Sequence, residues 1–129
     1  MTLFSKIIVG DIPCYKIAEN EKFIAFLDIF PAMQGHTLVV PKVETDRLFD
    51  LPDDYLQDIL IFAKPITNAI KTAFGYDRVN ILTIGFEVPH AHIHLLPMNN
   101  MGDMDLFAQK KKATDEELKA VQEKIVALL

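Results

Sequence analysis

One long stripe of apolar residues in the middle of the chain constrains the fold most. From Leu56 to Phe74, apolar side chains recur at intervals of three and four residues, which is the spacing of one face of an α-helix. Pro52 is typical of the first turn of a helix, and Gly75 is typical of a C-terminal cap. The pattern therefore predicts a long helix that must bury one face against another layer of the protein.

Short runs rich in β-branched and aromatic residues flank this helix on both sides and predict strands. They cover residues 15–18, 23–27, 36–40, 78–84 and 90–96. Residues 2–9 predict an opening helix, and the capping-box pattern Thr114-Asp115-Glu116-Glu117 predicts the start of a last one. Because strands that follow one another closely in sequence tend to pair, we expect an α+β fold: an antiparallel five-stranded sheet with helices packed on one face.

Composition excludes several classes of protein. A net charge of −5 argues against a broad basic surface for nucleic acid. The apolar runs are far shorter than the ~20 residues that a membrane-spanning helix needs. Half of the residues are hydrophobic, which is enough for the core of a single domain over residues 1–129. The N-terminal residues do not resemble an export signal and Cys14 is the only cysteine, so we expect a cytoplasmic protein.

The stretch PHAHIHLLP at residues 89–97 has the densest group of potentially reactive side chains in the sequence. His90, His92 and His94 occupy alternate positions, so on a strand their rings would share one face while the apolar residues between them face the core. Repulsion between neighbouring rings would keep most of them neutral near pH 7, with lone pairs available.

Three interpretations of this pattern remain open from the residues alone. The rings are hydrogen-bonded structural histidines, or two of them share a metal ion, or one neutral imidazole attacks phosphorus while its neighbours orient it and hold phosphate oxygens. The stretch contains no Asp or Glu, and the one cysteine is remote, which weighs against a metal.

The pattern His-φ-His-φ-His-φ-φ, in which φ is apolar, resembles the signature of the histidine triad (HIT) nucleotide hydrolases and transferases. Other segments resemble landmarks of that family in the same order: LFSKII at 3–8, GDIP at 10–13, FLDIFP at 26–31 and GHTLVVPK at 35–42. The resemblance covers residues 3–97 and leaves 98–129 as a connector and helix, whose lysine run 110–112 we interpret as a solvated loop. It implies a HIT-like fold and a homodimer.

The resemblance also implies roles for individual residues. His92 aligns with the nucleophile of the family, His90 and His94 with the histidines that orient it and bind phosphate oxygens, and His36 with a fourth histidine of the same site. Asp28 aligns with the residue that binds ribose hydroxyls. The other implied nucleotide-binding residues are Phe4, Ile7, Phe26 and Ile29 at the purine, and Glu87 and Val88 through their backbone N–H groups. Without the resemblance, Phe4, Ile7 and Phe26 would be interpreted as core, and Asp28 as a cap of the following turn.

The chain departs from the family pattern at two places. Gly85-Phe86-Glu87-Val88 stands where many members have Gly-Gln-(Ser/Thr)-Val, so a ring and a carboxylate replace two hydrogen-bond donors. Thr2 and Ser5 stand where some members have the paired cysteines of a structural zinc site. We therefore expect no metal, and we expect no cofactor.

The sequence predicts a nucleotide hydrolase or transferase that cleaves purine nucleoside 5′-phosphoramidates, or related nucleotide conjugates, at the α-phosphorus through a nucleotidyl-histidine intermediate. The expected partner is a small purine nucleotide, with no nucleic acid and no membrane. The alternative is a regulatory protein that binds purine nucleotides but has little catalytic activity, for which Phe86 and Glu87 are the motivating residues.

Overall fold

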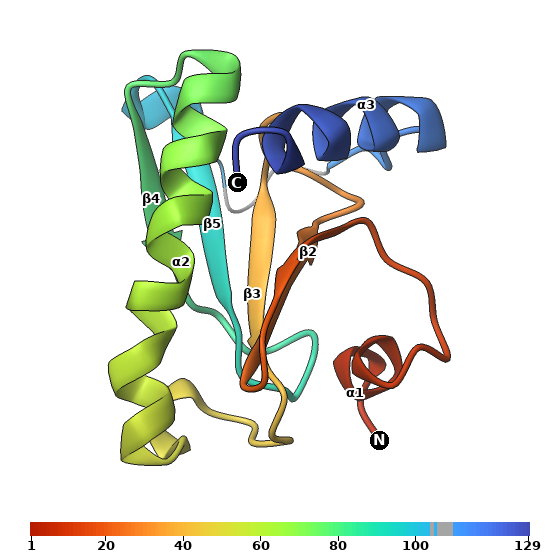
Figure 1. The fold of residues 1–129 in the computed structure, drawn as a ribbon, viewed down its shortest axis with the longest axis vertical. Coiled ribbons are helices and arrows are strands. Elements are labelled where there is room, and N and C mark those ends of the chain that lie inside the picture. The colour runs from red at the N-terminus through yellow and green to blue at the C-terminus, as the bar shows by residue number, and fades with distance from the viewer. Residues whose placement is uncertain (104, 106–109) are drawn as a thin grey trace.

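The computed structural model describes residues 1–103, 105 and 110–129. Within them, five strands form one antiparallel sheet in the order β1-β2-β3-β5-β4 (Figure 1). The strands are β1 Lys16–Glu19, β2 Phe23–Leu27, β3 Thr37–Pro41, β4 Arg78–Leu82 and β5 Ile93–Met98, and the α-helices are α1 Leu3–Ile8, α2 Asp53–Phe74 and α3 Asp115–Val126. The predicted α+β class and antiparallel sheet are confirmed.

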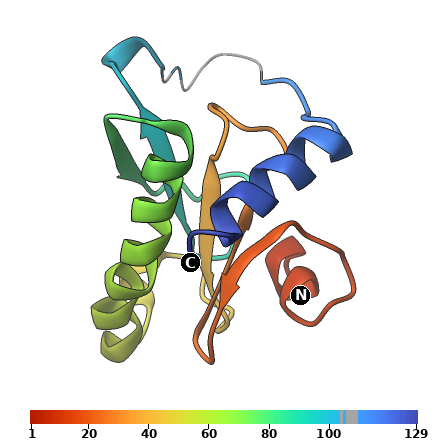
Figure 2. The ribbon, with the colours of Figure 1, turned by 45° about the horizontal axis from the view of Figure 1, so that its top comes forward.

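The two longer helices, α2 and α3, pack on the same face of the sheet, as expected (Figures 1 and 2). Their buried side chains meet those of alternate strand residues, such as Val39 and Leu95, which are both fully buried. The intervening strand residues point the opposite way. Phe26 and Leu38 belong to this second face, where Phe4 of α1 covers them. The short helix α1 therefore leaves part of the second face available for a cavity.

Helix α2 begins and ends close to where its sequence signals predict. Pro52 is its N-cap, and Gly75, at φ +73°, is its C-cap. Near its C-terminal end the helix packs against the backbone of the β2–β3 loop at Gly35, which has φ +98°. A Cβ atom at Gly35 would lie 3.2 Å from Cγ2 of Ile70 and 3.4 Å from the ring of Phe74. The helix thus fixes the chain immediately before His36.

The predicted strand at residues 90–96 is displaced, because β5 begins at Ile93. Before it, the chain bends: the N–H of His90 donates to the carbonyl of Val88 at 2.8 Å, and the N–H of Ala91 donates to the carbonyl of Thr45 at 2.6 Å. Of the three histidines only His94 lies on the strand, so the prediction that all three rings share one strand face is wrong. Among the described residues, no helix has both the length and the apolar character that crossing a membrane requires.

Candidate active site

A cavity of about 980 Å³ lies on the sheet face that α1 partly covers, within the range of small-molecule sites. Every site residue expected from the sequence lines it except His90. Its polar lining residues are Asp28, His36, Glu87, His92, His94 and Lys110. A second cavity of about 360 Å³ lies against α3 and shares Asp28 and His36 with the first. The polar side chains of the larger cavity make it the candidate site.

His90 is fully buried and lies behind the cavity. Its Nε2 atom is 2.8 Å from the carbonyl oxygen of Pro41, and its Nδ1 atom is 2.8 Å from the hydroxyl of Thr2. Because a carbonyl only accepts, we assign the ring proton to Nε2, and the Thr2 hydroxyl then donates to Nδ1. Both ring nitrogens are engaged, so a contact between His90 and phosphate oxygens does not fit this placement. The bend before β5 turns the ring into the interior.

A polar cluster made of Thr2, Ser5, Glu44 and His90 links α1 to the bend that precedes β5. The hydroxyl of Ser5 donates to Glu44 at 2.5 Å, and the N–H of Thr2 donates to the same oxygen at 3.1 Å. These contacts lower the pKa of Glu44 and favour its ionised form. The hydroxyl of Thr2 in turn accepts from the N–H of Ser5 at 3.0 Å.

The Thr2–Ser5–Glu44–His90 cluster also bears on the structural zinc considered above. Zinc in structural sites prefers thiolate and imidazole ligands. The cluster offers two hydroxyls and a carboxylate beside one imidazole, and both nitrogens of that imidazole already take part in hydrogen bonds. The residues present do not fit a structural zinc ion, and its absence from the protein stays a prediction.

His92 has one ring nitrogen engaged and one available. Its Nδ1 atom is 2.7 Å from the backbone carbonyl of His90, which can only accept, so Nδ1 carries the proton and Nε2 keeps its lone pair. Burial lowers the pKa of His92, which keeps the ring neutral near pH 7. Phe4 packs edge-on against the ring, with centroids 5.0 Å apart. The hydroxyl of Thr83 donates to the backbone carbonyl of His92 at 2.9 Å, a contact that no sequence pattern indicates.

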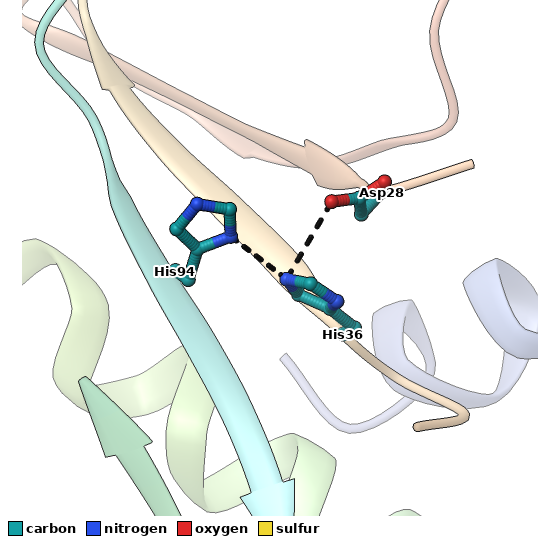
Figure 3. Close-up of side chains that lie close together, drawn as sticks. All are labelled: Asp28, His36 and His94. Carbon is teal, nitrogen blue, oxygen red and sulfur yellow. Dashed lines mark hydrogen bonds and ion pairs between the residues drawn. The ribbon is translucent and has the colours of Figure 1, made fainter. Parts of the chain in front are cut away.

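His36 and His94 form a directed pair (Figure 3). The backbone N–H of Ala32 donates to Nδ1 of His36 at 3.0 Å, so the proton of the neutral His36 ring is on Nε2. That proton is donated to Nδ1 of His94 at 2.9 Å, which leaves the His94 proton on Nε2. Burial is the main cause that lowers the pKa of each ring to about 4. Both rings are therefore neutral near pH 7, as expected, although burial matters more than repulsion between rings.

Asp28 lies beside this pair, with its Oδ2 atom 3.6 Å from Nε2 of His36 (Figure 3). Its Oδ1 atom accepts from the N–H of Phe30 at 2.8 Å, so the carboxylate does cap the turn after β2 while it also lines the cavity. Burial raises the pKa of Asp28. The interpretation of Asp28 as a cap of the following turn is confirmed, and its contact with ribose hydroxyls stays a prediction.

Asp28, His36 and His94 offer ligand atoms within 4.8 Å of one another, which is a candidate metal arrangement. A metal ion there would need the lone pair of Nε2 of His36. The Ala32 N–H occupies the Nδ1 lone pair, so Nε2 carries the ring proton instead. A metal would have to break the Ala32 hydrogen bond, and the proton arrangement therefore disfavours the metal interpretation.

The apolar half of the cavity comes from α1, from β2 and from the loop after β2. The residues expected at the purine, Phe4, Ile7, Phe26 and Ile29, all line it. The rings of Phe4 and Phe26 also pack edge-to-face on each other, with centroids 5.6 Å apart, and both are buried. These two side chains are at once core and cavity wall, which is suited to the flat apolar face of a base.

Lys110 is a lining residue that the sequence reasoning missed. The interpretation of residues 110–112 as a solvated loop agrees with the exposure of Lys111 and Lys112, whereas Lys110 is half-buried at the cavity. The three lysines are equivalent in sequence, so no local pattern distinguishes the one that faces the cavity. Cys14 also lines the cavity, and burial raises the pKa of its thiol, as fits an unreactive side chain.

Comparisons with known proteins identify relatives of this chain. The HIT domain family matches residues 9–101. Adenosine 5′-monophosphoramidase hnt1 of Schizosaccharomyces pombe is 37% identical over 129 aligned residues, which span 95% of this chain and 94% of that protein. An uncharacterised HIT-like protein of Methanocaldococcus jannaschii is 38% identical, over 95% of this chain and 99% of its own.

A solved structure extends the likeness to three dimensions. The crystal structure of a HIT-like protein involved in cell-cycle regulation from Bartonella henselae has a TM-score of 0.86 and 30% sequence identity, over 99% of this chain and 96% of that one. The family match spans most of the chain, and the curated relatives cover nearly all of it at more than 30% identity. This protein therefore belongs to the HIT family.

Proposed function

We propose that this protein cleaves purine nucleoside 5′-phosphoramidates, or related nucleotide conjugates, at the α-phosphorus. The observation that carries the proposal is the state of His92. Its Nδ1–H donates to the carbonyl oxygen of His90 with 2.7 Å between nitrogen and oxygen, and its Nε2 lone pair remains available beside a cavity of about 980 Å³. A neutral, oriented imidazole is the nucleophile that displacement at phosphorus needs.

The reaction has two displacements. Nε2 of His92 attacks the α-phosphorus, the bond from phosphorus to the leaving amine breaks, and the amine departs with a proton. Water then attacks the nucleotidyl-His92, which releases the nucleoside monophosphate and restores the ring. The Nε2–H of His94 is positioned to donate to a phosphoryl oxygen in both steps, because His36 engages its other nitrogen. The backbone N–H groups of Glu87 and Val88 are further donors in this proposal.

Adenine is the base that the comparisons favour, since the relative from Schizosaccharomyces pombe is named an adenosine 5′-monophosphoramidase. Asp28 would accept hydrogen bonds from the ribose, and the apolar wall would hold the purine. We further propose that residues 1–129 act as one HIT domain in a cytoplasmic homodimer. The exposed Ile81 on β4, one of the two edge strands of the sheet, is a suitable contact for a second copy.

A phosphoramidate assay tests the proposal. The native protein should release AMP from adenosine 5′-phosphoramidate. When the substrate carries a label on its nucleotidyl group and the reaction is quenched without acid, the label should be found on His92. AMP binding without any release would favour the alternative, a regulatory protein that binds nucleotides. A panel of phosphoramidates, dinucleoside polyphosphates and nucleotide sugars, tested together, then identifies the preferred leaving group.

A further inference from the structure

The histidines of the cavity do not provide positive charge for an anionic ligand. His36 and His94 have pKa values of about 4, and burial also lowers the pKa of His92. All three rings are neutral near pH 7, so they offer hydrogen bonds without net charge. A nucleotide phosphoryl group is anionic, and removing such a charge from water is costly unless another charge lies close to it. A cation from another part of the chain would balance it.

Lys110 is the only basic side chain among the described residues that line the cavity, whereas Asp28 and Glu87 are both acidic. Lys110 lines the same cavity as Asp28, His36 and His94, and its charge contributes to the lowered pKa of the two histidines. The chain next to it is held in place, because the N–H of Ala113 donates to the carbonyl of Ile29 at 2.9 Å.

The present contacts of Lys110 leave it able to bind a ligand. Its Nζ atom donates to the carbonyl oxygen of Asp105 at 3.4 Å, which is near the upper limit for a hydrogen bond. An ammonium group has three donors, and among the described residues it makes this one long contact to a neutral oxygen. Phosphoryl oxygens would form shorter, charge-assisted hydrogen bonds.

We propose that Lys110 binds the phosphoryl oxygens of the nucleotide and supplies the positive charge that the histidines lack. This inference rests on the proposed function for the nature of the ligand. The division of labour is then simple: His92 attacks, His94 donates a directed hydrogen bond, and Lys110 balances the charge of the phosphoryl group. Lys110, which lies shortly before α3, thereby takes part in the site.

The test compares AMP with adenosine, which lacks the phosphate, by isothermal titration calorimetry. Lys110→Gln should weaken AMP binding about tenfold while adenosine binding is unchanged, because only the charge-assisted contact is lost. Lys110→Arg, which keeps the charge, should stay within about threefold of the native protein. Lys111→Gln is the matched control, since it removes the same charge from the neighbouring exposed position, and it should have little effect.

Two results overturn this proposal: unchanged AMP affinity in Lys110→Gln, or an equal loss for AMP and adenosine. Thermal melting of each variant shows that the fold is retained. Failure of the proposed function is seen separately, as a native protein that binds AMP but releases none from adenosine 5′-phosphoramidate. In that case the comparison of AMP with adenosine still tests Lys110.

Discussion

Nε2–H of His36 donates to Nδ1 of His94 at 2.9 Å. The direction of that hydrogen bond is set by the N–H of Ala32, which donates to the other ring nitrogen of His36. A neutral imidazole has one donor and one acceptor, so fixing one nitrogen fixes the other. The backbone N–H thus fixes which nitrogen of His36 carries the proton, and His36 in turn fixes which nitrogen of His94 does. His94 consequently presents a donor rather than a lone pair toward the cavity, whereas His92 presents a lone pair. Two identical side chains two residues apart thus carry their ring protons on different nitrogens, Nδ1 in His92 and Nε2 in His94.

Replacing the nucleophile gives the most direct test of the site. His92→Asn should lower the turnover of adenosine 5′-phosphoramidate by more than about a thousandfold, as removal of a nucleophile does in other enzymes. The variant should fold, because His92 lines a cavity, so a smaller side chain there leaves the packing of the core largely intact. The measurement is AMP release followed by chromatography, with circular dichroism to verify folding. Activity close to that of the native protein would place the nucleophile elsewhere.

The Thr2–Ser5–Glu44–His90 cluster should act on turnover through position. Ser5→Ala removes a hydrogen bond to an ionised carboxylate and should lower the unfolding free energy. Because the carbonyl of His90 orients His92, we expect a reduced kcat with little change in KM. Glu44→Gln should also reduce kcat with little change in KM, but by less. The exposed Glu21→Gln is the matched control, and steady-state kinetics with urea unfolding provide both readouts. An effect on stability alone would restrict the cluster to a structural role.

The pH dependence of activity follows from the burial of His92. Its pKa lies below the ordinary value of 6.5, and only the neutral ring is nucleophilic. We therefore expect kcat/KM to be constant from neutral to mildly alkaline pH and to fall on the acid side with a midpoint below 6.5. A pH–rate profile of the native protein measures that midpoint. A midpoint at or above 6.5 would contradict the burial argument.

Stability should also respond to acid through His36. Its pKa is lowered from 6.5 to about 4 in the folded protein, so between these values the unfolded chain binds more protons. The unfolding free energy therefore falls as the pH decreases from 6.5 toward 4 and loses nothing further from this group below that. His36→Asn keeps an acceptor for the Ala32 N–H but does not titrate, so its stability should decline less over this range. Parallel urea titrations at several pH values measure the difference, and identical slopes would refute it.

Gly35 and Gly10 form a matched pair for testing how α2 supports the site. Both have positive φ, +98° and +86°, so alanine is strained at either position. At Gly10 a Cβ atom would meet nothing within 4 Å, whereas at Gly35 it would press on Ile70 and Phe74. Gly10→Ala should cost about 1 kcal/mol, and Gly35→Ala should cost more and also lower activity by moving His36. Equal losses of stability in urea unfolding would show that the contact with α2 has no effect.

The elements of the fold were largely predictable because their signals are local. The apolar stripe of α2, the glycine at its end and the capping box at Thr114 are each confined to a few residues, and each appears where expected. The strand predicted at 90–96 was displaced for a reason that sequence periodicity does not contain. The carbonyl of Thr45, remote in sequence, accepts from the N–H of Ala91, and the described pairing of β5 with β3 extends back only to Ile93.

The site was predictable in its residues but not in their protonation. The resemblance to the HIT family indicated which side chains meet, and all except His90 line the cavity. Which nitrogen of each ring carries the proton depends on single contacts, such as the carbonyl of Pro41 at His90. Lys110 was not predictable because it belongs to a uniform run of three lysines, and nothing in that run indicates which of them lines the cavity.

The donor that sets the order of protons in the His36–His94 pair belongs to the main chain at Ala32. Every residue except proline carries that N–H, so replacing the Ala32 side chain leaves the polarity of the two rings intact. During evolution, point mutations at this position to any residue other than proline would therefore be neutral for the proton arrangement of the imidazoles. Insertions or deletions between β2 and β3, which redirect the loop, are the genetic changes to which this part of the site is vulnerable.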